Sequence, residues 1–589
     1  MFSLFKKLGW FFSAYKTKYI WGLVTLTLVR MVEILPPLLI GLALDDIHTG
    51  VLTSSLLLYY VIALLLTTAV AYVGGYVFLY QLYGGSLRLE ASLRFKFVNQ
   101  ILKMKPHFFQ KFRTGDLMAR ATNDLGAVTE ASGFGVLTLF DATLYMVVIL
   151  AMMIFTVSWR LTLIAVAPLP IYAYLVTKMG KVYDKRYAAS QKAFSNLNNK
   201  VLESILGMRV IRAYVQEKEE IDRFAKLAAL VCDKNRQIEA LEALFEPAGR
   251  WLMGLCFFIT IFYGSHLILA GQMTLGSLVT FNVYLSMLTW PIFAISVLIN
   301  VMQRGKTSLE RIHEALDAPI DVVDQAETNQ VGIPEVIAIK ALNFTYPDAP
   351  NEALTDITLT INRGETIGIV GKTGSGKTTL LRQFLREYPL ESGKIVVNGL
   401  PLESLKQKEV LSWIGYVPQE HILFSKSVRE NILYGVDEAR EADLARVIQL
   451  AALTDDLEFF TDGLDTIVGE KGIALSGGQK QRISIARAMA THPEILILDD
   501  ALSAVDAKTE TSIVENIRKE RGALHSNMGK TTIITAHRLS AVVHADQIIV
   551  LEDGKISQMG THDALMAAGG WYKEQYEHQN LQLGGAEDE

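Results

Sequence analysis

The sequence predicts a two-domain protein in which a bundle of six membrane-spanning helices precedes a domain of mixed α/β structure. Three observations predict this fold: charge-free apolar stretches in the first half, short alternating strands and helices in the second, and a glycine-rich phosphate-binding motif between a strand and a helix there. Of the 589 residues 50% are hydrophobic, and the mean hydropathy of +0.27 is too high for an ordinary soluble protein. This composition excludes a disordered chain.

Charge and cysteine content exclude further classes of protein. The net charge of −5 combines a basic first half with an acidic second half, and no overall basicity suggests nucleic acid as a partner. Cys232 and Cys256 are the only cysteines, so neither a disulfide scaffold nor a cysteine-based zinc site is expected. The N-terminus lacks a small-residue cleavage site, and we expect no cleaved signal peptide.

Six stretches of the first half approach the length of about 20 apolar residues that a membrane-spanning helix needs. Lys- and Arg-rich segments alternate with nearly uncharged loops, so both termini and two long loops are predicted to be cytoplasmic. The long loops have helical composition, and we expect short docking helices in them near Arg113–Asp116 and Gln216–Arg223. The predicted membrane domain is 1–317, with spans at about 19–44, 55–80, 133–158, 161–180, 248–270 and 275–303.

Three ionisable residues fall within these spans. Arg30 and Glu33 lie three residues apart on one helix face and can pair, and Asp141 lies near the start of the third span. Charge inside a membrane is costly and normally faces protein or a wet cavity, so either helix pairing or substrate contact explains these residues. Three aromatic residues of the last span fit either an apolar pocket or core packing: Tyr284, Trp290 and Phe293.

A linker containing two prolines and several acidic residues, 318–335, separates the two halves. Strands that alternate with helices then indicate a largely parallel sheet within a domain at 336–580, followed by an acidic tail at 581–589. The strands are predicted at Thr366–Val370, Ile495–Leu498 and Thr531–Thr535, and helices at Lys377–Glu387 and Lys480–Met489.

Residues Gly371–Thr378 read Gly-Lys-Thr-Gly-Ser-Gly-Lys-Thr, between a predicted strand and a predicted helix. This is the context of a P-loop, in which glycines let backbone N–H groups curl around phosphates at a helix N-terminus. Lys377 would reach the β- and γ-phosphates, and Thr378 would hold Mg²⁺. The residues predicted to bind the nucleotide here are Gly371, Thr373, Gly374, Ser375, Gly376, Lys377, Thr378 and Thr379.

Two further motifs fit a nucleotide site. Asp499 ends an apolar strand about 120 residues after the P-loop, where a carboxylate can position Mg²⁺ through water. Leu475–Gln479 reads Leu-Ser-Gly-Gly-Gln and is predicted to place a second phosphate-binding helix N-terminus here. A helix N-cap would need only the serine, so the full motif indicates more than a cap. One nucleotide does not need two phosphate-binding helix N-termini from the same chain. This motif is therefore predicted to contact the γ-phosphate of a nucleotide held by a second subunit. The contacting residues would be Ser476, Gly477, Gly478 and Gln479.

In these motifs the second half resembles the nucleotide-binding domain of ABC transporters, and Leu475–Gln479 matches the signature motif of that family. Six spans followed by one such domain resemble an exporter half-transporter over nearly the whole chain, with the greatest likeness to bacterial heterodimeric multidrug exporters. The resemblance implies ATP and Mg²⁺ as cofactors. It also implies that Tyr346 stacks on adenine, Gln419 senses Mg²⁺ and the membrane domain, and His537 is a switch near the γ-phosphate.

The resemblance places two more loops. Ser503–Asp506 matches the D-loop, and Thr466–Gly472, with Glu470, resembles a loop that contacts the coupling helices in exporters. It further implies a multi-pass protein of the bacterial plasma membrane with a cytoplasmic nucleotide-binding domain.

Asp500 departs from the family pattern, in which a glutamate general base usually follows the residue matched by Asp499. Aspartate is one methylene shorter, which withdraws the carboxylate by roughly 1–1.5 Å, and a displacement of ~1 Å can cost on the order of 10²-fold in rate. We therefore expect slow ATP hydrolysis at this chain's own P-loop. The expected catalytic residues are Asp500, His537 and Gln419, and the residues expected to bind Mg²⁺ are Thr378, Gln419 and Asp499. The intact signature would complete a competent site on a different partner chain that carries glutamate; a homodimer in which Asp500 works adequately is the alternative.

The expected function is ATP-driven export of hydrophobic or amphipathic small molecules by one half of a heterodimer. Its expected partners are a second half-transporter, the lipid bilayer and the transported molecules, and no nucleic acid. A lipid exporter or flippase of the same architecture is one alternative, and an ATP-gated regulatory or channel-like subunit is another.

Overall fold

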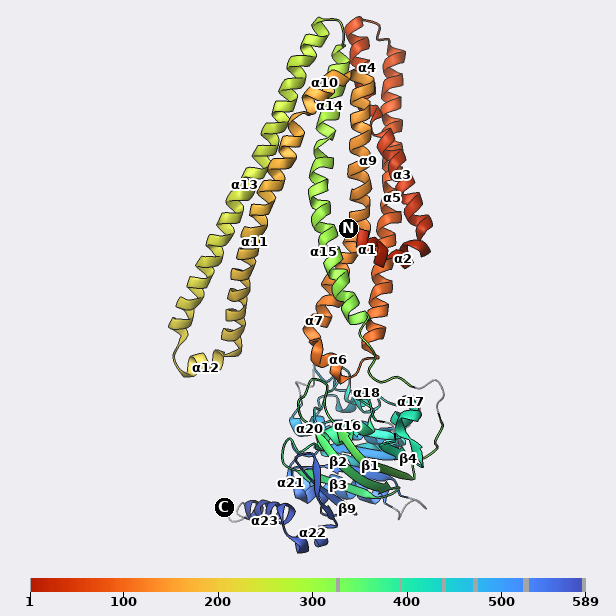
Figure 1. Ribbon diagram of the computed structural model, residues 1–589, viewed down its shortest axis with the longest axis vertical. Coiled ribbons are helices and arrows are strands. Elements are labelled where there is room, and N and C mark those ends of the chain that lie inside the picture. Colours follow the sequence, from red (N-terminus) through yellow and green to blue (C-terminus); the bar gives the residue numbers. More distant parts are fainter. Residues whose placement is uncertain are drawn as a thin grey trace. The chain divides into compact units, whose positions relative to one another are not determined.

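The computed structural model describes residues 2–324, 329–391, 393–436, 441–469, 475–522 and 529–584. The chain divides into two compact units (Figure 1), and each has its own hydrophobic core. The first unit comprises Met1–Ile101 and Thr114–Asp317, and the second comprises Leu102–Arg113 and Ala318–Glu589.

In the first unit the described residues form helices and short connections, and the helices pack in pairs, among them α3 with α5, α4 with α14, α9 with α15, and α11 with α13 (Figure 1). Π-helical turns at Arg120–Asp124, Ala131–Gly135 and Met153–Ser158 interrupt the third long helical stretch. The helices are α1 (Phe2–Lys7), α2 (Gly9–Ala14), α3 (Lys16–Val32), α4 (Leu35–Thr49), α5 (Ser54–Ile101), α7 (Thr114–Ala119), α8 (Leu125–Glu130), α9 (Val136–Met152), α10 (Trp159–Val166), α11 (Pro168–Leu206), α12 (Met208–Ala213), α13 (Glu217–Leu269), α14 (Leu275–Met287) and α15 (Thr289–Leu316).

Five helical stretches among the described residues are long and apolar enough to cross a membrane. They are Lys16–Thr49, Ser54–Ile101, Thr114–Ile171, Glu217–Leu269 and Leu275–Leu316. The third of these stretches contains the predicted third span and the start of the span predicted at 161–180. The backbone is extended at Ser158 between the two, and α11 then packs against α13. The first stretch breaks after Val32, where prolines follow at the start of α4; proline suits the first turn of a helix but not its interior.

The short helices of the long loops lie upstream of the positions that the sequence predicted. They are α6 (Pro106–Lys111) and α12, whereas the predicted positions near 113–116 and 216–223 begin the next helices, α7 and α13. The acidic residues there explain the difference, because Asp116 and Glu217 stabilise a helix in its first turn. Helix α6 belongs to the second unit, where Phe108 and Phe112 are buried.

The described residues of the second unit form two sheets. A six-stranded sheet has the order β10-β9-β3-β8-β7-β6, parallel except for β10, as the sequence predicted for the strands it identified. A four-stranded antiparallel sheet, β2-β1-β4-β5, was not predicted. The strands are β1 (Val336–Phe344), β2 (Leu354–Asn362), β3 (Thr366–Gly371), β4 (Ile395–Val397), β5 (Leu400–Pro401), β6 (Ile414–Val417), β7 (Ile495–Asp499), β8 (Thr531–Thr535), β9 (Gln547–Glu552) and β10 (Lys555–Gly560).

The helices of this unit pack around the strands, and α20 contacts β6 and β7. Helix α16 ends three residues before the predicted Glu387, and α20 starts three residues before the predicted Lys480, at the signature glycines. These helices are α16 (Lys377–Phe384), α17 (Gln407–Ser412), α18 (Val428–Ile432), α19 (Glu441–Leu450), α20 (Gly477–Ala490), α21 (Ala507–Arg521), α22 (His562–Ala568) and α23 (Trp571–Gly584).

The parallel register brings the ends of three strands to one edge. Asp499 of β7 pairs with Thr535 of β8, and Thr535 pairs in turn with Ile369 of β3. Carboxyl ends of parallel strands are where α/β sheets bind ligands. The loops that follow β3, β7 and β8 therefore lie together.

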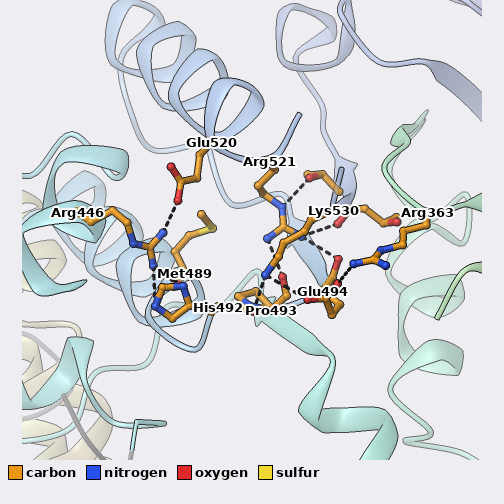
Figure 2. A network of polar contacts seen from close by, with 11 residues as sticks. Arg363, Arg446, Met489, His492, Pro493, Glu494, Glu520, Arg521 and Lys530 are labelled. Carbon is orange, nitrogen blue, oxygen red and sulfur yellow. Dashed lines mark hydrogen bonds and ion pairs between the residues drawn. The ribbon is translucent and has the colours of Figure 1, made fainter. Parts of the chain in front are cut away.

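Arg521 of α21 anchors the opposite ends of β7 and β8 (Figure 2). Its buried guanidinium donates to the carbonyl oxygens of Pro493 at 2.9 Å, Glu494 at 3.1 Å and Thr531 at 2.8 Å. Burial lowers the pKa of Arg521 to about 10. The Glu494 carboxylate is paired with Arg363 at 2.8 Å, so these contacts fix where both strands begin.

Candidate nucleotide site

The P-loop follows β3 and leads directly into α16. Gly371, Gly374 and Gly376 have φ values of 149°, 82° and 102°, which residues with a side chain rarely adopt. A Cβ on Gly371 would lie 2.2 Å from the Leu551 carbonyl oxygen. Backbone curvature and lack of space for side chains are what a loop wrapped around phosphates requires, so these residues fit the polyphosphate of a nucleotide.

Lys377 lies against this loop. Its ammonium group donates to the carbonyl oxygens of Gly371 at 2.8 Å and Lys372 at 3.0 Å. Burial lowers the pKa of Lys377, and the carboxylates of Asp500 and Asp499 oppose that effect. The Lys377 ammonium group, predicted to bind phosphate, is therefore close enough to the carboxylates of Asp499 and Asp500 to interact with them electrostatically.

Asp499 is held by three hydroxyl groups. It is 1% exposed, and its Oδ1 accepts hydrogen bonds from Thr378 at 3.0 Å and Thr535 at 2.8 Å. Its Oδ2 accepts from the Tyr416 hydroxyl at 3.3 Å. A carboxylate fixed beside the first-turn threonine of the P-loop helix matches the oxygen ligands that Mg²⁺ prefers, and these residues fit that ion.

Sequence reasoning missed Thr535 and Tyr416. Only the order and register of the strands show that these residues lie beside Asp499, because Tyr416 and Thr535 belong to the strands on either side of β7. Burial raises the pKa of Tyr416. The phenol therefore stays protonated and can donate to Asp499 at neutral pH.

Asp500 follows in a left-handed backbone conformation, with φ of 50°. Its N–H lies 3.1 Å from the Thr535 carbonyl oxygen and 3.0 Å from the Thr535 hydroxyl oxygen, and its own carbonyl accepts from Ser503 at 3.1 Å. The side chain is half-buried, and burial raises the pKa of Asp500 while His537 opposes that shift. The predicted general base thus lies near Lys377 and the exposed His537, on a backbone fixed at three points.

Two predicted nucleotide contacts lie in separate loops. The Tyr346 hydroxyl forms a 2.8 Å hydrogen bond with the Thr379 hydroxyl, and its half-buried ring packs edge-on against Tyr388 with centroids 5.2 Å apart. This places the predicted adenine-stacking ring beside the P-loop helix. Gln419 is exposed in a bend after β6.

The signature motif forms a capped helix start. The Ser476 hydroxyl accepts from the Gln479 N–H at 3.2 Å, and the Gln479 side chain accepts from the Ser476 N–H at 3.0 Å. Ser476 and Gly477 are exposed, and Gly478 follows in the first turn of α20. The Gln479 side chain also donates to Asp456 at 3.2 Å, so both ends of its amide are hydrogen-bonded within the chain. The Ser476 hydroxyl acts as an acceptor in the cap, which leaves its O–H able to donate to another group. Glu470 of the predicted coupling-helix loop lies outside the described residues.

Known proteins share these features. A family model for the ABC transporter transmembrane region matches residues 19–292, and the ABC transporter model matches residues 354–503. The chain is 48% identical to a probable multidrug resistance ABC transporter ATP-binding/permease protein, YheI, of Bacillus subtilis, over 99% of this chain and 98% of that protein. It is 37% identical to the multidrug resistance-like ATP-binding protein MdlA of Escherichia coli, over 98% and 97%. An ATP-dependent lipid A-core flippase of Syntrophus aciditrophicus is 34% identical, over 82% and 79%.

A solved bacterial Atm1-family ABC exporter with ATP bound has the same fold, with a TM-score of 0.75 at 24% identity over 96% of this chain and 98% of that one. The predicted fold, a helical transmembrane domain fused to an ABC nucleotide-binding domain, is confirmed. Both relatives match nearly the whole chain, and therefore both domains. The chain therefore belongs to the ABC transporter family, as a multi-pass membrane exporter that couples ATP hydrolysis to transport.

Proposed function

We propose that this chain is one half of a heterodimeric exporter of hydrophobic or amphipathic small molecules, and that the nucleotide site on its own P-loop hydrolyses ATP slowly. The observation that carries the proposal is Asp500, an aspartate on a backbone held at both its N–H and its carbonyl. A general base must come within hydrogen-bond reach of the proton that it abstracts. The anchored backbone cannot advance to make up for the missing methylene, so the site binds ATP but activates water poorly.

The chain carries the other residues proposed to bind the nucleotide, and a departure confined to Asp500 supports a partner with a different sequence at that position. Lys377 and Thr378 are proposed to hold the phosphates and Mg²⁺, together with Asp499, and Gln419 to reach the same ion; the hydrogen bonds of Lys377 to Gly371 and of Thr378 to Asp499 support this. When bound, Mg²⁺ neutralises charge on the phosphates. The exposed Ser476 is proposed to complete a second site on the partner, whose glutamate supplies the efficient base.

The proposed cycle is a shift between two populations. Two ATP molecules join the two nucleotide-binding domains, each held by one P-loop and the opposite signature motif, and hydrolysis releases that contact. Helices α6 and α12 are proposed to pass closure to the spans. Lys105, next to α6, lies in the field of Glu387 and Asp324, and burial lowers the pKa of Lys105 while Glu387 opposes this shift. We place the nucleotide-binding domain and both termini in the cytoplasm, at a bacterial plasma membrane.

The multidrug substrate class rests on the apolar spans and on the names of the two multidrug-resistance relatives. Lipid export is the second candidate, because a lipid A-core flippase is 34% identical over 82% of the chain. A channel-like or purely regulatory subunit is an outcome of the experiment below.

The experiment that tests the proposal is affinity purification of the tagged chain from its native membrane, followed by reconstitution. We expect a second ABC half-transporter with glutamate at the position of Asp500, and ATP-dependent movement of hydrophobic dyes. Vigorous ATP turnover by this chain alone, lost in Asp500→Ala, would refute the slow site and the need for a partner. Movement of labelled lipid without dye transport would favour the flippase, and an ATP-gated ionic current would favour the channel.

A further inference from the structure

The chain passes between the two units three times, each time at a terminus of a helix of the first unit: α5, α7 or α15. Helix α7 begins at Thr114, the first residue after the second passage, and α15 ends at Leu316, one residue before the third. Helix α15 contacts α8, α9 and the first two π-helical turns along its length. Two of the covalent connections to the nucleotide-binding unit therefore end on one packed pair of helical stretches, which leads to the spans predicted at 133–158 and 275–303.

Charged side chains near these two helix termini form a network, which we call the α7–α15 clamp. Its members are Asp116, Arg120, Asp124, Arg311 and Glu314. Arg311 of α15 donates from Nη2 to Asp116 Oδ1 at 2.6 Å, and its Nη1 lies 3.1 Å from Asp124 Oδ2. Arg120 reaches in the opposite direction, with Nη2 donating to Glu314 at 3.0 Å and Nη1 to the Arg311 carbonyl oxygen. Each helical stretch therefore contributes an arginine that the other one binds.

The centre of the clamp is buried. Arg120 is 6% exposed and Asp124 is 7% exposed. The Arg120 Nε also donates to Asp116 at 2.8 Å, and the Ser308 hydroxyl of α15 donates to Asp124 at 2.7 Å. Separating a buried ion pair leaves each charge without compensation, and a hydrogen-bonded polar network makes the elements that it joins rigid. The clamp therefore fixes α15 against α7 and the first π-helical turn.

The local backbone explains how one helical stretch supplies three members of the clamp. Asp116, Arg120 and Asp124 are spaced by four residues, and in an α-helix of about 3.6 residues per turn such a series moves around the helix. The wider π-helical turn at Arg120–Asp124 offsets this rotation, and all three side chains bind residues of α15. Since π-helical turns are rare and frequently lie at functional sites, this turn points to a function for the clamp.

Close packing continues from the clamp toward the predicted spans. A Cβ on Gly305 of α15 would lie 2.4 Å from the Cβ of Ala131, and a Cβ on Gly135 would lie 2.8 Å from the Met302 sulfur. Contacts this close leave the helices no room to shift against each other, and close-packed interiors transmit displacement. A movement applied at the clamp therefore reaches α9 and α15 together.

We propose that Arg120 and Arg311 are positioning residues for coupling, which join α7 to α15 so that both follow the nucleotide-binding unit as one rigid body. Without the clamp the two chain connections move separately, and part of the movement is lost before it reaches the spans. Both arginines act through the helices and not on the nucleotide. The inference needs only the coupling of ATP hydrolysis to transport, and it depends neither on the slow site nor on the class of molecule exported.

The test uses the full-length protein, purified with its partner, in nanodiscs. It measures ATP turnover and the ATP-induced change in hydrogen exchange at the loops 50–53 and 270–274, which connect α4 to α5 and α13 to α14. We expect Arg311→Met to leave ATP turnover close to that of the unaltered protein and to reduce the ATP-induced change in exchange on the order of tenfold. Arg304→Met is the matched control, because Arg304 lies on the same helix but pairs with Glu130 at the surface, and we expect it to change neither quantity.

Two further variants separate coupling from folding. Arg311→Lys keeps the charge, but one ammonium group cannot hold both Asp116 and Asp124, so its response should fall between those of Arg311→Met and the unaltered protein. Asp124→Cys with Ser308→Cys, in a chain with its two native cysteines replaced by alanine, allows a covalent link where the clamp was, because the two side-chain oxygens lie 2.7 Å apart. The unlinked pair should show the reduced response, and linking by a short bifunctional thiol reagent should restore it.

A normal exchange response in Arg311→Met would overturn the proposal. So would loss of ATP turnover and exchange response in equal proportion together with a lower melting temperature, which would leave the clamp as a structural element only. A linked protein that no longer responds to ATP would also overturn it, because the clamp would then have to open in each cycle. Failure of the proposed function is a separate result: the unaltered protein would respond to ATP in the loops but export no hydrophobic dye.

Discussion

Replacing Asp500 by glutamate should accelerate hydrolysis at this chain's own P-loop. The Asp500 N–H is held by Thr535 and its carbonyl by Ser503, so the backbone stays in place and the added methylene carries the carboxylate forward by roughly 1–1.5 Å. A gap of ~1 Å corresponds to a rate factor on the order of 10²-fold, and we expect Asp500→Glu to recover between about 10-fold and 10²-fold at this site. Total turnover of a heterodimer would rise at most about twofold, because the partner's site already works.

The assay must therefore report this site alone. Vanadate trapping of a photoreactive ATP analogue labels the polypeptide whose P-loop completed a hydrolysis step, and we expect labelling of this chain to rise in Asp500→Glu. Lys377→Ala in the same background is the control, since removal of the P-loop ammonium should abolish the gain. Unchanged labelling in Asp500→Glu, or a gain that survives Lys377→Ala, would refute the argument that reach limits this site.

Three further predictions concern the same domain. Tyr346→Ala should raise the KM for ATP on the order of tenfold, as expected for loss of base stacking worth about 1–3 kcal/mol, whereas Tyr346→Phe, which loses only the hydrogen bond to Thr379, should stay near the unaltered value in ATPase titrations. Arg521→Met leaves buried carbonyl oxygens without donors and should lower the free energy of unfolding by about 3 kcal/mol in denaturant titrations, while Arg518→Met on the exposed face of α21 should change it little. Burial raises the pKa of Asp500, so the folded state holds that proton more tightly and stability falls as the pH rises from the usual aspartate range through the raised value. Asp500→Asn should remove this loss, and its stability advantage should be greater at pH 7 than at pH 3.5; an equal advantage at both would contradict it.

The sequence predicted the parts of the site that depend on local chain chemistry. The P-loop glycines have the positive φ values that their spacing implies, and β3, β7 and β8 lie where apolar runs predicted strands. Tyr416 and Thr535 were not predicted as neighbours of Asp499, because their positions depend on which strands lie beside β7. Residues far apart in the chain reveal such a contact only through sheet order.

The short helices α6 and α12 end just before the charged segments where docking helices were predicted, and this offset has a local cause. The charged segments near 113–116 and 216–223 suggested surface helices, yet their acidic residues mark the first turns of α7 and α13. Proline at the start of α6 and glycine before α12 were the better signals of a short helix between two long ones. In the antiparallel sheet, β4 and β5 have only three and two residues, too few for a periodic pattern, whereas β1 and β2 have nine each and were overlooked.

Asp499 and Asp500 show how the backbone assigns different roles to neighbouring residues with the same side chain. Asp499 ends a buried strand, and hydroxyl groups from three other segments fix its carboxylate, so it can orient a ligand but cannot move. At Asp500 the chain turns to a positive φ, which lets a side chain leave the sheet edge and approach the exposed His537. Side-chain length matters little at the first position and decides function at the second. A glutamate at position 500 therefore tests whether the distance from the carboxylate to the attacking water limits hydrolysis, and it leaves the carboxylate of Asp499 in place. Because the two roles are separate, a single substitution tests the proposed slow site.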